Sequence, residues 1–142
     1  DNIPPYGGIE KGLKPLLPVL DHLVTTLVED LRQRGLLDQT LVIAMGEFGR
    51  TPKIGTQDSS DGRDHWPIVA SMLMAGGGLR HGQVIGSTEP DGGQIATRPV
   101  HAADLAATIY QHFGVPLDAE SLDGTGRPVP IVYNGSPIHE LF

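Results

Sequence analysis

The run Thr40–Met45 constrains the fold of this chain most, because it is apolar on both faces and rich in β-branched residues. It follows a segment, Leu13–Leu31, whose apolar residues recur at the i, i+3, i+4, i+7 spacing of an amphipathic helix. A second apolar run, Ile68–Ala75, ends at three consecutive glycines. Helices alternating with strands buried on both faces are typical of α/β proteins. The sequence therefore predicts a three-layer α/β/α fold around a mainly parallel sheet.

Proline and glycine positions set the ends of the predicted elements. The first helix should begin near Lys14, because Pro18 deeper inside a helix would cost about 3 kcal/mol. Gly35 can end that helix in a left-handed cap. Three further elements are predicted: a short strand at Gln83–Ile85, a turn at Glu89–Gly93, and a second helix at Val100–Phe113 that stops at Gly114.

Composition excludes several classes of function. The 142 residues fit one segment, 1–142, whose Pro- and Gly-rich end, 117–142, is expected to form an irregular tail. A net charge of −7 argues against a general nucleic-acid or anionic-membrane surface. No apolar run reaches the length of a membrane span. Because cysteine is absent, disulfides and thiolate sites are excluded.

The candidate functional region is the long loop from Gly46 to Pro67. Loops of more than about 15 residues in compact domains are usually functional or disordered. Glu47 follows the buried strand, and its carboxylate suits a hard cation or a general-base role. His65 is a candidate metal ligand that Asp64 would orient. The simpler alternatives are an ion pair between Glu47 and Arg50, and a loop histidine held by hydrogen bonds.

Three cations lie around the same loop and could clamp a phosphate or sulfate group. Ordinary salt bridges to the carboxylates of the loop are the alternative explanation. His101 precedes the second helix, where it either faces a crevice or caps the helix. The three cations are Arg50, Lys53 and Arg63, and the carboxylates are those of Glu47, Asp58, Asp61 and Asp64.

Several motifs together resemble one bacterial family. They are TLVIAMGEFGRTP, GRDHWP, the apolar run with AGGG, GQVIGST and RPVHAADLAATIYQHFGVP, and the resemblance covers about Leu13 to Pro116. The chain resembles the carboxy-terminal part of the sulfatase-like domain-of-unknown-function family 1501, in the alkaline phosphatase superfamily. In relatives, an Asp-His pair after the strand ligates one metal and a later histidine ligates another. Here Glu47-Phe48 matches the pair, and His65 matches the later histidine. Glu47 can still coordinate a metal, but Phe48 cannot.

The resemblance implies a metal-dependent hydrolase of sulfate or phosphate esters, exported or periplasmic. It implies a divalent metal (zinc, calcium, magnesium or manganese), a sulfated or phosphorylated small molecule or glycan as partner, and a nucleophile from the missing amino-terminal half of the parent. The isolated segment should have little or no activity. The site residues implied are Glu47 and His65 as metal ligands, Arg50 and Arg63 as catalytic groups, Lys53 with both arginines as the anion clamp, and Asp64 and His101 as supports.

A non-catalytic role is the alternative. In it, a descendant of such enzymes keeps the fold and uses its anion-binding crevice for sulfated or phosphorylated glycans, or for a protein partner. Phe48, at a position where relatives have a ligand, favours this alternative.

Overall fold

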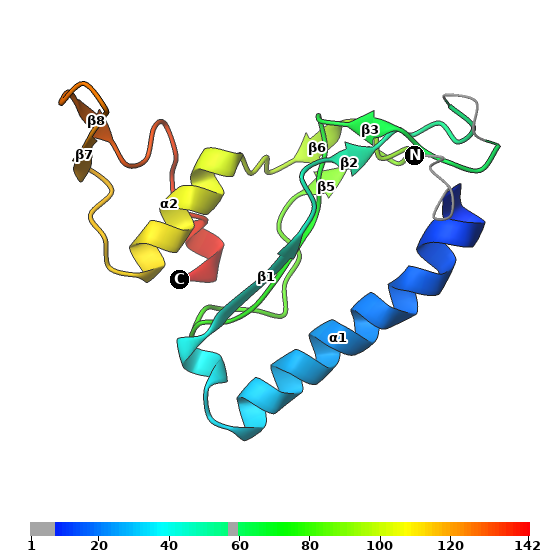
Figure 1. The fold of residues 1–142 in the computed structure, drawn as a ribbon, viewed down its shortest axis with the longest axis horizontal. Helices are drawn as coiled ribbons and strands as arrows, with labels where there is room; N and C mark the ends of the chain where they lie inside the picture. Colours follow the sequence, from blue (N-terminus) through cyan, green and yellow to red (C-terminus); the bar gives the residue numbers. More distant parts are fainter. Residues whose placement is uncertain (1–7, 57–59) are drawn as a thin grey trace.

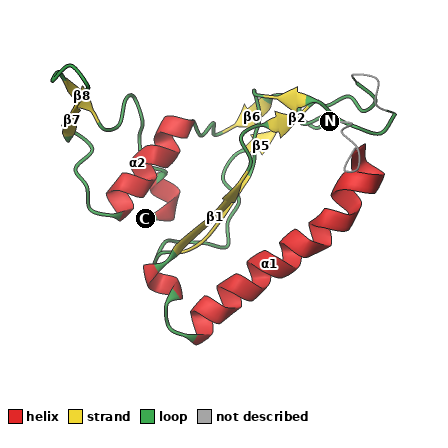
Figure 2. Cartoon of the chain, in the orientation of Figure 1, coloured by secondary structure: helices red, strands yellow, loops and turns green. Residues whose placement is uncertain are grey.

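The computed structural model describes residues 8–56 and 60–142, which form two α-helices joined by long loops and short antiparallel strand pairs (Figures 1 and 2). The helices are α1 (Lys14–Gln33) and α2 (Ala102–His112), with the helical turns η1 (Ile9–Leu13), η2 (Leu37–Gln39) and η3 (His139–Leu141). The strands are β1 (Leu41–Met45), β2 (Gly49–Arg50), β3 (His65–Trp66), β4 (Met72–Gly76), β5 (Ser87–Thr88), β6 (Ile95–Thr97), β7 (Glu120–Leu122) and β8 (Pro128–Pro130).

The predicted first helix is confirmed, with its boundaries. α1 begins at Lys14, directly after η1, and Pro18 lies inside it. Gly35 adopts the left-handed conformation at φ +68°, and the N–H of Leu36 donates to the carbonyl of Leu31 at 2.8 Å. The apolar stripe of α1 is exposed, however: none of its residues is buried.

The prediction of a three-layer α/β/α fold with a mainly parallel sheet is wrong. β1 pairs with β4 in antiparallel register, from Leu41 opposite Gly76 to Met45 opposite Met72. The other three strand pairs in the described residues are also two-stranded and antiparallel. A parallel pair needs a crossover, usually a helix, and no helix lies between β1 and β4 in the described part of the chain. An apolar pattern predicts burial on two faces but not the direction of the neighbouring strand.

The middle of the chain differs from the prediction in one strand. Gln83–Ile85 is irregular, and β5 forms later, at Ser87–Thr88, where it pairs with β6. The predicted turn at Glu89–Gly93 is confirmed: the N–H of Gly92 donates to the carbonyl of Glu89 at 2.8 Å. This turn joins β5 to β6.

The small buried core lies around α2, whose position was predicted. The buried apolar residues of the described chain are Leu105, Ala107, Ile138 and Leu141. The buried hydroxyl of Thr108 accepts a hydrogen bond from the N–H of Ile138 at 2.9 Å. Residues 117–142 contain the β7–β8 hairpin, which projects beyond α2 in Figure 1, and η3, which returns to the core. The end of the chain is therefore fixed to α2.

Candidate functional site

The structure joins the two motifs that the sequence singled out. β2 and β3 pair antiparallel, with Gly49 opposite Trp66 and Arg50 opposite His65. Next to this pair, the N–H of Thr51 donates to the carbonyl of Asp64 at 2.9 Å, and the N–H of Asp64 donates to the Thr51 hydroxyl at 3.0 Å. We call residues 46–56 and 60–67 the β2–β3 unit. The two motifs thus form one structural unit.

Gly49 is required by the close approach of the chain after β3. A Cβ atom at position 49 would lie 2.0 Å from the carbonyl oxygen of Val69, which is far inside a steric clash. The GEFGRTP motif therefore needs glycine here for backbone packing, independently of any catalytic role.

His65 is exposed, and its ring packs against Phe48. The two ring centroids lie 4.3 Å apart at an interplanar angle of 46°. The Asp64 carboxylate accepts a hydrogen bond from the backbone N–H of His65 at 2.7 Å. Asp64 therefore fixes the backbone of the candidate ligand, and Phe48 fixes the position of its ring.

Glu47 is exposed directly after β1, and its carboxylate forms no hydrogen bond or ion pair within the described residues. The predicted alternative of a Glu47–Arg50 ion pair is thus not observed there. No group of three or more histidine and acidic residues that could hold a metal occurs in the described part. Glu47 and His65 could hold a metal only with further donors from outside these residues.

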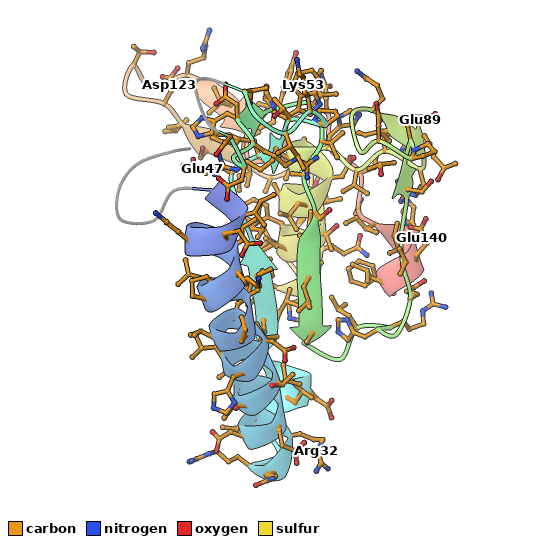
Figure 3. All side chains as sticks on the ribbon, turned by 90° about the vertical axis from the view of Figure 1, so that its right-hand side faces the viewer. Arg32, Glu47, Lys53, Glu89, Asp123 and Glu140 are labelled. Carbon is orange, nitrogen blue, oxygen red and sulfur yellow. The ribbon has the colours of Figure 1, made fainter. Side chains whose placement is uncertain are left out.

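The three candidate cations differ in their surroundings. Arg63 is half-buried, and its Nε donates to the backbone carbonyl of Thr51, so it helps to hold the β2–β3 unit together. Arg50 and Lys53 are exposed. Glu47 and Lys53 lie near the same end of the molecule, and Arg32 lies at the opposite end (Figure 3). Arginine side chains can bind an anion, and a carboxylate can bind a hard cation.

His101 lies at the N-cap of α2, as the capping alternative predicted. Its backbone N–H donates to the Asp104 carboxylate at 2.8 Å, and that carboxylate also accepts from the N–H of Ser136 at 2.9 Å. These hydrogen bonds, the one from Ser136 first, hold the pKa of Asp104 below its usual value of 3.8. The observed hydrogen bonds of His101 thus belong to the start of α2, and any support of the β2–β3 unit remains a prediction.

The comparisons with known proteins give one match. Residues 6–142 match the family described as Protein of unknown function (DUF1501). The chain belongs to the DUF1501 family. No curated protein and no solved structure matches this DUF1501 chain.

Two contacts of the site in this DUF1501 chain were not predicted. The indole N–H of Trp66 donates to the carbonyl of Gly93 at 2.7 Å, which ties the β5–β6 turn to β3. The Asp61 carboxylate accepts from the N–H of Glu10 at 3.1 Å, which ties the β2–β3 unit to η1 at the start of α1. A buried indole N–H needs an acceptor, but sequence spacing does not name the acceptor.

A cavity of about 460 Å³ lies apart from the predicted site residues. It is lined by β4 and the residues before it, by 80–88, by β6 and the residues after it, and by the segment at η3. None of the seven predicted site residues lines it. In the described part, no helix is long and apolar enough to cross a membrane.

Proposed function

We propose that the β2–β3 unit is the anion-binding half of a metal-dependent hydrolase site for sulfate or phosphate esters, completed by the amino-terminal half of the parent protein. The single observation that carries this proposal is the pairing of β2 with β3. It brings the cations of GEFGRTP and GRDHWP, together with Glu47 and His65, into one unit. The link to the sulfatase and alkaline phosphatase enzymes is part of this proposal.

Each side chain has a defined task in the proposed site. Arg50 binds the sulfate or phosphate oxygens, because its planar guanidinium suits a tetrahedral anion. Lys53 adds a second positive charge on the exposed side. Arg63 keeps the segment around Thr51 in place through its hydrogen bond to the backbone carbonyl of Thr51. Glu47 and His65 supply two donors for a divalent metal. Such a metal, when bound, polarises the ester and stabilises the developing negative charge.

The test is ester hydrolysis by the full-length protein. The substrates are p-nitrophenyl sulfate and p-nitrophenyl phosphate, and the variant is Arg50→Gln. Loss of one charged anion contact should lower kcat/KM about 10-fold or more. Arg34→Gln is the matched control, because Arg34 is an exposed arginine that pairs with Asp30 at the far end of α1. Hydrolysis that is absent in the wild type, or equal in Arg50→Gln and wild type, contradicts the proposal.

A second candidate is a non-catalytic protein that binds sulfated or phosphorylated glycans. The contact between Phe48 and His65 favours it, because the aromatic ring occupies the place beside the histidine where a further ligand would be expected. Titration of the full-length protein with a sulfated disaccharide distinguishes the two. Binding that weakens in Arg50→Gln, without any hydrolysis and without metal, supports the non-catalytic candidate.

A further inference from the structure

The cavity beside η3 has the size and the walls of a small-molecule site. Its volume of about 460 Å³ lies within the roughly 300–1,000 Å³ that is usual for ligand pockets. Apolar side chains from β4, β6 and η3 form much of its wall. Six of them are Met72, Met74, Ile85, Ile95, Ile138 and Leu141. A wall of this kind suits the nonpolar body of a small molecule.

Hydrogen bonds between distant segments hold the cavity walls in place. The backbone N–H of Arg80 donates to the carbonyl of Leu141 at 2.8 Å, and the side-chain amide of Gln83 donates to the carbonyl of Glu140 at 2.8 Å. Arg98, which also lines the cavity, donates to the Glu140 carboxylate at 2.6 Å and 2.7 Å. Three parts of the wall are thus tied together at η3, so the cavity is preformed in the folded chain.

The charge of the cavity is opposite to that of the chain. The chain has 17 acidic residues against 10 lysines and arginines, yet no acidic residue in the described part lines the cavity, whereas Arg80 and Arg98 do. Glu140 neutralises Arg98. The guanidinium of Arg80 is exposed and forms no hydrogen bond or ion pair with the described residues. An uncompensated arginine beside an apolar wall favours a ligand with both an anionic group and a nonpolar body.

We propose that this cavity binds a small organic anion, whose acidic group pairs with Arg80 and whose nonpolar body lies against β4, β6 and η3. Another part of the protein's own polypeptide would be the competing occupant. Because such a segment would fill the cavity, the anion could then not bind to the full-length protein, so a titration of that protein separates the two. The proposed ester site is independent of this cavity, since none of its residues lines it.

The test is a calorimetric titration of the full-length protein with 2-naphthoate and with its neutral analogue 2-naphthamide. We expect one 2-naphthoate per chain, bound more tightly than about 1 mM. Arg80→Gln should weaken the binding of 2-naphthoate about 5-fold and leave that of 2-naphthamide unchanged, because only the anion pairs with the guanidinium. Arg127→Gln is the matched control, since Arg127 is an exposed arginine that pairs with Asp123 at 3.3 Å, away from the cavity. It should change neither affinity.

A second pair of variants locates the bound ligand. Ala70 is a small, exposed residue that lines the cavity, so Ala70→Trp should obstruct it and abolish the binding of both ligands. Ala96 is also exposed, but it does not line the cavity, although its neighbours Ile95 and Thr97 on β6 do. Since successive side chains of a strand point to opposite faces, Ala96→Trp should leave binding unchanged.

Three results overturn the proposal. The first is a wild-type protein that binds no 2-naphthoate, as expected if another part of its polypeptide fills the cavity. The second is equal binding by Ala70→Trp and the wild type, which would place the ligand elsewhere, for example on the exposed stripe of α1. The third is an equal effect of Arg80→Gln on both ligands, which would remove the role of the charge.

Discussion

Single side chains hold residues 46–56 and 60–67, the β2–β3 unit, in one shape. The Thr51 hydroxyl donates to the carbonyl of Lys53 at 3.1 Å and accepts from the N–H of Asp64 at 3.0 Å, so one side chain bridges both motifs. Glu47 and His65 could be selected from the sequence because chemistry-bearing residues after a buried strand are a known pattern. The contact of His65 with Phe48 could not be predicted from the sequence, because ring packing depends on how the two segments meet.

At the residue scale, we predict that Gly49→Ala destabilises the protein. The added methyl group would meet the Val69 carbonyl at 2.0 Å, so the backbone of β2 or of Val69 must move. The expected loss in the free energy of unfolding is about 2 kcal/mol or more. Urea unfolding of the full-length protein measures it.

Gly124→Ala is the matched control for this substitution. No atom lies within 4 Å of its added Cβ, so the change in unfolding free energy should stay within about 0.5 kcal/mol. Equal stability of the Gly49→Ala protein and the wild type would contradict the close backbone approach.

Among the elements, the two long helices were predictable and the strand pairing was not. The spacing of apolar residues predicts where α1 and α2 lie, and Gly35 and Gly114 predict where they end. Strand direction depends on the path of the chain between β1 and β4, and periodicity carries no information about that path. The same limit explains the missed β5, where Ser87 and Thr88 show no apolar pattern.

The element that closes the chain, η3, should be sensitive to acid. Arg98 binds the Glu140 carboxylate through Nε at 2.6 Å and through its terminal nitrogen at 2.7 Å. This pairing lowers the pKa of Glu140 from 4.5 to about 2. The folded state thus binds fewer protons than the unfolded state. The stabilisation is complete above about pH 4.5 and is lost as the pH falls towards 2.

Hydrogen exchange of residues 136–142 at pH 6 and pH 3 measures this effect. We expect faster opening of this segment at pH 3, after correction for the intrinsic pH dependence of exchange. In Glu140→Gln the pH dependence should be smaller. The pH dependence that remains comes from Asp104, whose lowered pKa acts in the same direction. Opening that is independent of pH in the wild type would contradict the role of the Arg98–Glu140 pair.

At the scale of the whole molecule, the apolar patterns of the sequence predicted more buried apolar side chains than the structure contains. The buried apolar residues lie around α2 and η3, whereas most of the α1 stripe is exposed and β1 is only half-buried. Apolar periodicity reports that a face will be covered, but it does not report which polypeptide covers it. The prediction of a parallel sheet assumed that other residues of this chain would pack against these apolar faces.

Metal content of the full-length protein is the most direct test of the proposed half-site. Elemental analysis would compare the wild type with Glu47→Ala, His65→Ala and the control Glu89→Ala, which removes an exposed carboxylate from the β5–β6 turn. The proposal predicts bound divalent metal in the wild type and the control, and loss of at least one metal ion per molecule in both site variants. A metal-free wild type, or equal metal content in all four proteins, would contradict it.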